Sequence, residues 1–187
     1  MKRCPWPGED KIMQRYHDHE WGVPLHNDRK LFEFMVLDAF QAGLSWRTVL
    51  HKRKNFERAF DNFNAQKIAR YTPAKINSLM SNAGIIRNRL KIQGTVKNAQ
   101  AFLHIQKKYG RFDTFIWQFV RGKLKVNRWK TLRQIPARSK ESDAMSDTLK
   151  KAGFTFVGST ICYAFMQAAG MVNDHLVPCF RHKEVKL

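Results

Sequence analysis

Residues 79–93 read LMSNAGIIRNRLKIQ, and this stretch decides the fold that the sequence predicts. The end of an apolar helix is followed by a turn that contains Gly84, by two β-branched residues, and by the start of a basic helix. Gly84 can adopt a positive φ, and the turn and the following helix N-terminus would then present unpaired backbone N–H groups to an anion. Three basic residues would surround that anion: Arg87, Arg89 and Lys91. The stretch therefore predicts two helices joined by a hairpin that holds phosphate, with plain helix packing around a Gly turn as the alternative.

The rest of the chain also has helical periodicity and almost no alternating strand pattern. We expect helices over residues 28–43, 46–50, 73–80, 88–109, 115–120, 142–153 and 159–170. Their predicted N-terminal caps are Asp28, Ser45, Thr72, Asp113, Ser142, and Ser159 or Thr160. Residues 122–139 carry many charges and little period, so we expect a long loop there. With no internal repeat, the prediction is a single all-α domain over residues 1–187, made of two helical lobes that share one core.

The composition indicates a partner of opposite charge. The 187 residues include 34 Lys and Arg against 15 Asp and Glu, which gives a net charge of +19. A field of that size attracts polyanions, and nucleic acid is the commonest one, although a protein that is merely basic would look the same. No stretch approaches the roughly 18 apolar residues of a membrane span, and the N-terminus lacks the apolar run of a signal peptide. We therefore expect no membrane contact and a cytoplasmic location.

The three cysteines are too few, and odd in number, for a disulfide framework. Cys162 shares a helical stripe with Phe165, Met166 and Ala169, so we expect it to be buried as a small apolar residue. Cys4 and Cys179 lie near the two ends of the chain and remain candidates for metal binding.

Two Cys and two His residues form a candidate metal site: Cys4, His17, His175 and Cys179. Thiolate and imidazole are the ligands that zinc prefers, and two of each close a tetrahedron with no position left for water. Such a site would be structural and would tie the two ends of the chain together. Unligated residues are the alternative, and three competing ligands fit the spacing equally well: His19, Asp174 and His182.

Large aromatic residues are concentrated in the first quarter of the chain: Trp6, Tyr16, Trp21, Phe40 and Trp46. Each one alone suggests a core residue, but together they could line a pocket for a flat, cationic ligand. Asp38 interrupts the apolar run MVLDAF. Burying its charge there destabilises the fold by roughly several kcal/mol unless another group binds the carboxylate. A buried salt bridge with an Arg and a contact with a ligand both remain open.

Five blocks of the sequence resemble the 3-methyladenine DNA glycosylase I family, in the same order and over nearly the whole chain. They are RCPWP at 3–7, YHDHEWGVP at 16–24, QAGLSW at 41–46, NAGIIRNRLKI at 82–92 and FVGSTICYAFMQAAGMVNDH at 156–175. The resemblance implies the helix-hairpin-helix glycosylase fold and a pocket for a damaged base. It also implies a structural Zn²⁺ ion held by Cys4, His17, His175 and Cys179.

The activity implied by the resemblance is hydrolysis of the N-glycosidic bond of 3-methyladenine in double-stranded DNA. The products would be the free base and an abasic site, and we expect a monomer without lyase chemistry. By resemblance, Tyr16, Trp21 and Trp46 line the pocket, and Asp38 is the acidic residue that reads the base. A loop would enter the duplex in place of the extruded base, with Gln41, Gly43 and Leu44 as its contacts.

This chain departs from the family pattern at two positions. Well-known members have Glu where this chain has Asp38, and Tyr where it has Met13. Both changes affect the expected base selectivity more than the reaction class. Two other readings therefore stay open, a zinc-stabilised DNA-binding protein without catalysis, and a glycosylase of different base specificity. An assay for the base released from methylated DNA separates all three.

Overall fold

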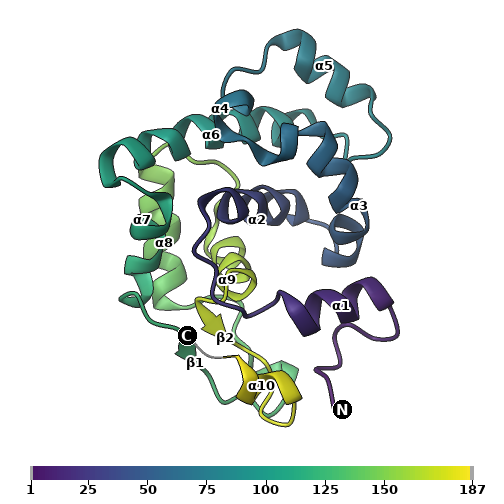
Figure 1. The fold of residues 1–187 in the computed structure, drawn as a ribbon, viewed down its shortest axis with the longest axis vertical. Coiled ribbons are helices and arrows are strands. Elements are labelled where there is room, and N and C mark those ends of the chain that lie inside the picture. The colour runs from purple at the N-terminus through teal and green to yellow at the C-terminus, as the bar shows by residue number, and fades with distance from the viewer. Residues whose placement is uncertain (1, 186–187) are drawn as a thin grey trace.

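The computed structural model describes residues 2–185, which are mostly helical (Figure 1). The α-helices are α1 (Lys11–His19), α2 (Asp28–Gln41), α3 (Trp46–Ala59), α4 (Ala65–Ile68), α5 (Pro73–Ser81), α6 (Arg89–Tyr109), α7 (Phe112–Ile116), α8 (Lys140–Lys151), α9 (Ser159–Ala168) and α10 (Phe180–Glu184). The 3-10 helices are η1 (Asp61–Phe63), η2 (Trp117–Val120) and η3 (Leu132–Gln134). None of the helices in residues 2–185 is long and apolar enough to cross a membrane.

Two very short strands depart from the prediction of a purely helical chain. Strand β1 (Lys125–Val126) pairs in parallel with β2 (Val172–Asn173). Helices α1, α4 and α10 are not predicted from the sequence either, and α4 and α10 are too short to show a clear apolar stripe. The longer predicted helices are confirmed, with differences at their ends.

The helix caps are partly as predicted. The side chains of Ser45 and Thr72 cap α3 and α5, as expected. Helix α2 is instead capped by Asn27, and α8 by Ser139. The carboxylate of Asp28 accepts hydrogen bonds from the N–H groups of Phe112 and Asp113, both at 2.9 Å, and so caps α7. Sequence could not show this, because α7 reaches Asp28 only through the tertiary fold.

Helix α2 lies at the centre of the molecule, and every residue from Leu31 to Phe40 is buried (Figure 1). It packs against α3, α6, α7 and α9. Phe40 is fully buried, with its ring centroid 4.7 Å from that of Phe56 and 5.9 Å from that of Phe60. Phe40 therefore belongs to the core and does not line a ligand pocket, contrary to the prediction from the sequence.

Residues 82–88 form the predicted hairpin between α5 and α6. Gly84 does not adopt a positive φ, contrary to expectation, but any side chain there would be tightly packed. A Cβ atom at this position would lie 3.0 Å from Oδ1 of Asn82 and 3.2 Å from the side chain of Asn55. Nζ of Lys52 on α3 donates to the carbonyl oxygen of Ala83 at 3.2 Å, so the hairpin is fixed to α3. Arg87 and Arg89 are exposed on it.

Lys91 lies elsewhere than the sequence predicts. Its side chain is 7% exposed, and Nζ donates hydrogen bonds to the carbonyl oxygens of Phe40 and Ala42 at 2.8 and 2.5 Å. Burial also lowers the pKa of its ammonium group. Lys91 thus satisfies carbonyl groups at the C-terminal end of α2, which no α2 residue can reach, and is not available to a phosphate at the surface.

Gly170, just after α9, lies in close contact with the backbone of Val23. It has a φ of +65°, and a Cβ atom there would overlap the carbonyl group of Val23. Gly170→Ala should therefore lower the free energy of unfolding by about 3 kcal/mol or more in urea titrations, through backbone strain and steric overlap. The matched control is Gly158→Ala, because a Cβ at Gly158 meets nothing within 4 Å and its φ is −61°. The control should lose less than about 1 kcal/mol, and equal losses in both variants would contradict this account of Gly170.

Candidate active site and metal centre

A cavity of about 220 Å³ lies among the N-terminal segment, α1, α2, α3 and α9. Its lining residues are Trp6, Tyr16, Trp21, Asp38, Gln41, Trp46, Ile135, Ala164, Gln167 and Ala168. Four of the five aromatic residues singled out in the sequence come together here, and Phe40 does not. Periodicity and motifs do not predict Ile135 or the α9 residues as part of the cavity, because their position there depends on how α9 and residues 122–139 fold back.

The aromatic rings pack at steep angles rather than filling the cavity as a flat stack. The ring centroids of Trp6 and Trp21 are 5.1 Å apart with an interplanar angle of 69°. Those of Tyr16 and Trp46 are 5.2 Å apart at 47°. The indole N–H groups of Trp6 and Trp46 are buried and have no acceptor. A buried donor without a partner costs free energy, and both of these donors belong to residues that line the cavity.

Asp38 is the most unusual residue of the cavity. Its side chain is 2% exposed, and Oδ2 has no hydrogen-bond partner. No Lys, Arg or His within residues 2–185 forms an ion pair with it. Burial raises the pKa of this carboxyl group well above its usual value. Of the two hypotheses that the sequence left open, the buried salt bridge is wrong, and a carboxyl group facing a ligand cavity remains.

A second, very small cavity lies on the other side of Asp38. Its lining residues are Met35, Asp38, Leu149, Val157, Ile161, Cys162 and Phe165. The thiol of Cys162 donates to the carbonyl oxygen of Val157 at 3.3 Å, and burial raises its pKa to about 12. The prediction that Cys162 is a buried core residue is therefore confirmed. Met13 is buried in the core and does not line the larger cavity.

The loop between α2 and α3 forms part of the cavity rim. Gln41 lines the cavity. Gly43 has a φ of +77° with open space around its Cα, and the side chain of Leu44 is 43% exposed. This loop is therefore free to meet a partner, whereas Lys91, predicted to do the same, is not.

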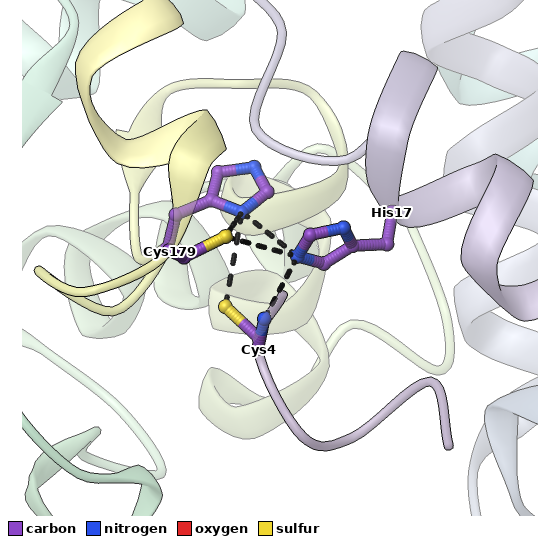
Figure 2. Close-up of side chains that lie close together, drawn as sticks. Cys4, His17 and Cys179 are labelled. Atoms are coloured by element: carbon purple, nitrogen blue, oxygen red, sulfur yellow. Dashed lines mark hydrogen bonds between the residues drawn. The ribbon is translucent and has the colours of Figure 1, made fainter. Parts of the chain in front are cut away.

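The four predicted metal ligands come together from both ends of the chain (Figure 2). Cys4 precedes α1, His17 lies on α1, His175 follows β2, and Cys179 caps α10. All four side chains are buried, and one ligand atom from each lies within 4.8 Å of the others. Nε2 of His17 lies 3.5 Å from Sγ of Cys179, and Nδ1 of His175 lies 3.8 Å from Sγ of Cys4.

The hydrogen bonds around the cluster fix which ring nitrogens face its centre. Nε2 of His175 lies 2.9 Å from the carbonyl oxygen of Trp21, which can only accept, so this nitrogen carries the proton. Nδ1 of His17 lies 2.8 Å from the carboxylate of Asp18, which is held in turn by Arg3 at 2.8 Å. The two remaining nitrogens, Nε2 of His17 and Nδ1 of His175, face each other across 3.2 Å. Two ring nitrogens that bind one metal ion would face each other in this way, and the outer hydrogen bonds are of the kind that orient metal ligands.

The two thiols of the cluster differ in how readily they ionise. The hydrogen bond between the two Cys side chains, with smaller effects from both His rings, lowers the pKa of Cys179. The same hydrogen bond and burial raise the pKa of Cys4. A thiolate is the form that binds a metal ion, and the donor set of two sulfur and two nitrogen atoms fits a closed tetrahedral site.

The competing ligands named from the sequence lie elsewhere. Asp174 accepts four hydrogen bonds, from Asn127, Trp129, Tyr163 and Gln167, at 2.7 to 2.8 Å. His19 is exposed, and Nε2 of His182 lies 2.8 Å from the carbonyl oxygen of Asn127. The cluster of Cys4, His17, His175 and Cys179 is thus the group that could hold a metal ion.

The comparison with known proteins agrees with this geometry. A family model described as methyladenine glycosylase matches residues 6–182. The chain belongs to this family. The DNA-3-methyladenine glycosylase of Haemophilus influenzae is 49% identical over 177 residues, which cover 95% of this chain and 96% of the relative.

Solved structures of family members have the same fold. A crystal structure of 3-methyladenine DNA glycosylase I superposes with a TM-score of 0.94 at 46% identity, covering 96% of this chain and 98% of the other. The enzyme from Staphylococcus aureus, whose structure concerns the recognition of 3-methyladenine, gives a TM-score of 0.93 at 35% identity and covers 96% of both chains. The helical fold is therefore that of the family over nearly the whole chain.

The unpaired state of Asp38 predicts a distinct pH dependence of stability. Because burial raises the pKa of Asp38 in the folded protein, the unfolded chain loses this proton at a lower pH than the folded protein does. The free energy of unfolding should therefore fall as the pH rises above about 4, by up to about 1.4 kcal/mol per pH unit, until the folded-state pKa is reached. Asp38→Asn should remove this fall and be more stable than the parent at pH 8. Urea titrations at pH 5, 6.5 and 8 measure the effect.

Asp147→Asn is the matched control, because Asp147 is exposed on α8. It should leave the pH dependence of the parent unchanged. If Asp38→Asn and the parent lost stability equally between pH 5 and pH 8, Asp38 would not be a buried group without a partner.

Proposed function

We propose that this protein hydrolyses the N-glycosidic bond of 3-methyladenine in double-stranded DNA, releasing the free base and leaving an abasic site. The observation that carries the proposal is the buried, unpaired carboxyl group of Asp38 in a cavity lined by aromatic rings. Membership of the methyladenine glycosylase family supports it, as does the activity that gives the relatives their names.

A base within a duplex cannot reach such a cavity, so the nucleotide must be extruded from the stack. A damaged base stacks and pairs poorly, which lowers the cost of extrusion and contributes to selectivity. The exposed side chain of Leu44, next to the open turn at Gly43, is suited to fill the space that the base leaves. Gln41 connects this loop to the cavity. We infer that residues 41–44 enter the duplex.

Alkylation at N3 makes the adenine base cationic and weakens its bond to deoxyribose, so the reaction needs no strong general acid. A cationic base in the cavity would stabilise the ionised form of Asp38, which could then accept a charge-assisted hydrogen bond from the exocyclic amine. The aromatic rings around it favour a flat cation over a neutral base. Asp38 therefore acts in this proposal as the residue that reads both the charge and the edge of the base.

Asp38→Asn tests this role, because Asn is nearly isosteric and removes the charge. The variant should lose about 10- to 150-fold in excision of 3-methyladenine, which corresponds to roughly 1.5 to 3 kcal/mol for a charge-assisted hydrogen bond. Its binding to undamaged DNA should barely change. The measurement is the single-turnover release of free base from methylated duplex, with the released bases separated by chromatography.

The same chromatogram distinguishes the alternatives. Release of a different alkylated base would indicate another specificity on this scaffold, to which the shorter side chain of Asp38 would contribute. A protein that binds duplex DNA but releases no base would be a DNA-binding protein without catalysis. Full activity of Asp38→Asn on 3-methyladenine would disprove the role of this carboxyl group.

We further propose that the metal is a structural Zn²⁺ ion held by Cys4, His17, His175 and Cys179. The two facing ring nitrogens, the two sulfur atoms and the burial of all four side chains support this ion. The ion would tie the N-terminal segment to α10 and leave no open position for water, so it would supply stability and no step of the chemistry.

Purified protein should accordingly contain about one zinc ion per chain by elemental analysis. Cys4→Ser and His175→Ala should lower the zinc content and the melting temperature together, because binding free energy is lost from the folded state. Cys162→Ser is the matched control, since Cys162 is equally buried but lies outside the cluster, and it should retain the ion. Metal-free protein with an unchanged melting curve would overturn the proposal.

The remaining predictions belong to the same proposal. One hydrophobic cluster extends from Cys4 to Cys179, which supports a single domain over residues 1–187. The hairpin is fixed to α3 and exposes Arg87 and Arg89, which supports a helix-hairpin-helix element that holds DNA phosphates.

The three cysteines form no disulfide, in keeping with a cytoplasmic protein, and a monomer is still expected.

A further inference from the structure

The segment from residue 121 to residue 140 is the most basic part of the chain. It reads RGKLKVNRWKTLRQIPARSK and contains eight Lys or Arg residues and no acidic residue. Two of the eight are neutralised by α8, because Lys125 pairs with Glu141 at 2.7 Å and Arg138 pairs with Asp143 at 3.8 Å. The other six are exposed and form no ion pair within residues 2–185, and three of them lie close together in the sequence: Arg128, Lys130 and Arg133.

This segment is held rigidly, although the sequence predicts only a loop. Nδ2 of Asn127 and Nε1 of Trp129 donate to Oδ1 of the fully buried Asp174, at 2.7 and 2.8 Å. The N–H of Val177 donates to the carbonyl oxygen of Trp129 at 2.8 Å. Strand β1, which immediately precedes Asn127, pairs with β2. The backbone of the segment is therefore fixed to the interior on its inner side.

The fixed backbone determines where the basic side chains point. Asn127 and Trp129 turn inward to Asp174, so the intervening Arg128 and the following Lys130 turn outward and are exposed. A capping box between Thr131 and Gln134 then forms η3. The turn returns the chain to the interior, and Arg133 stays exposed at its surface.

The same turn brings the segment to the base cavity, because Ile135 directly after η3 is one of the cavity residues. The α5–α6 hairpin approaches from another direction, since it is fixed to α3 by Lys52 and α6 is fixed to the end of α2 by Lys91. In Figure 1, β1 lies toward one end of the molecule, and α5 lies at the other. The cavity thus lies between two separate groups of exposed basic side chains.

We infer that Arg128, Lys130 and Arg133 form a second contact surface for DNA phosphates, on the opposite side of the damaged base from the hairpin. The partner is the backbone of the strand that carries the extruded base, and the inference rests on the proposed function. Phosphate contacts on both sides of the damaged nucleotide would stabilise the bent DNA that extrusion requires, because the strand could not straighten on either side without losing contacts. Rigid anchoring lets these side chains bind without the entropic cost of ordering a loop.

The test compares three double variants that each remove two positive charges. Arg128→Ala with Arg133→Ala removes the proposed surface, and Arg87→Ala with Arg89→Ala removes the hairpin pair. Lys107→Ala with Lys108→Ala is the matched control, because both lysines are exposed at the far, C-terminal end of α6. Fluorescence anisotropy over a salt series measures the binding of each protein to a duplex with one central tetrahydrofuran abasic analogue.

The first two variants should each flatten the slope of log K against log salt by about two, and each lost contact should weaken binding on the order of ten-fold at 0.1 M salt. The control should keep the parent slope. Two shortened duplexes, each ending a few base pairs to one side of the analogue, then locate the contacts. The defect of the segment variant should disappear on one shortened duplex, and the defect of the hairpin variant on the other.

A segment variant with the slope of the control would overturn the inference, and so would loss of both defects on the same shortened duplex. The proposed function is judged by a separate measurement, the release of free base by the parent protein. If the parent releases no base while the slopes change as expected, the proposed function fails and the DNA surface stands. If the parent releases base and the slopes do not change, only the surface is wrong.

Discussion

Helix α2 is buried along its whole central length, and this constraint organises the molecule. Every polar group on such a helix must obtain a partner from another element or remain unsatisfied. Glu33 obtains Arg53 of α3 at 2.7 Å, and that guanidinium also binds Glu20 at the end of α1 at 2.6 Å. The carbonyl groups at its C-terminal end obtain Lys91 of α6. Asp38 is the exception on this helix, because the packing that satisfies the other groups leaves its Oδ2 without a partner.

The metal cluster and the base cavity are two parts of one structure. The rings of Trp6 and Trp21 line the cavity, and they also contact the cluster, with centroid distances of 5.4 Å to His17 and 4.7 Å to His175. The carbonyl of Trp21 fixes the ring of His175 directly. An ion in the cluster would therefore hold two walls of the cavity in place without touching the base, which is how a structural metal can influence recognition.

The sequence predicts what depends on local pattern, and it fails where a long side chain reaches across the fold. The long helix α6, the caps Ser45 and Thr72, and the set of four metal ligands follow from periodicity, cap chemistry and resemblance. The predicted roles of Lys91 in phosphate binding and of Asp28 as the cap of α2 are wrong, because each side chain forms hydrogen bonds with backbone groups of another helix. Gly84 shows the same limit. It lies against the side chain of Asn55 and does not adopt the positive φ that the sequence suggests. The choice between a buried salt bridge and a ligand contact for Asp38 also depends on the tertiary fold, because only the surrounding residues show that no Arg reaches its carboxylate.

An unpaired carboxyl group in a buried cavity costs stability, and that cost supports selectivity. In the empty cavity the raised pKa favours the neutral acid, which gains nothing from a neutral purine beyond an ordinary hydrogen bond. A cationic purine restores the ionised form and gains an ion pair in surroundings of low polarity, where charges interact strongly. Partners for Asp38 in the free protein would remove this difference, because the carboxylate would already be satisfied before the base arrived. In the proposed function, the absence of a partner for Asp38 within the described fold is therefore the feature by which the cavity would distinguish a charged, damaged base from a neutral one.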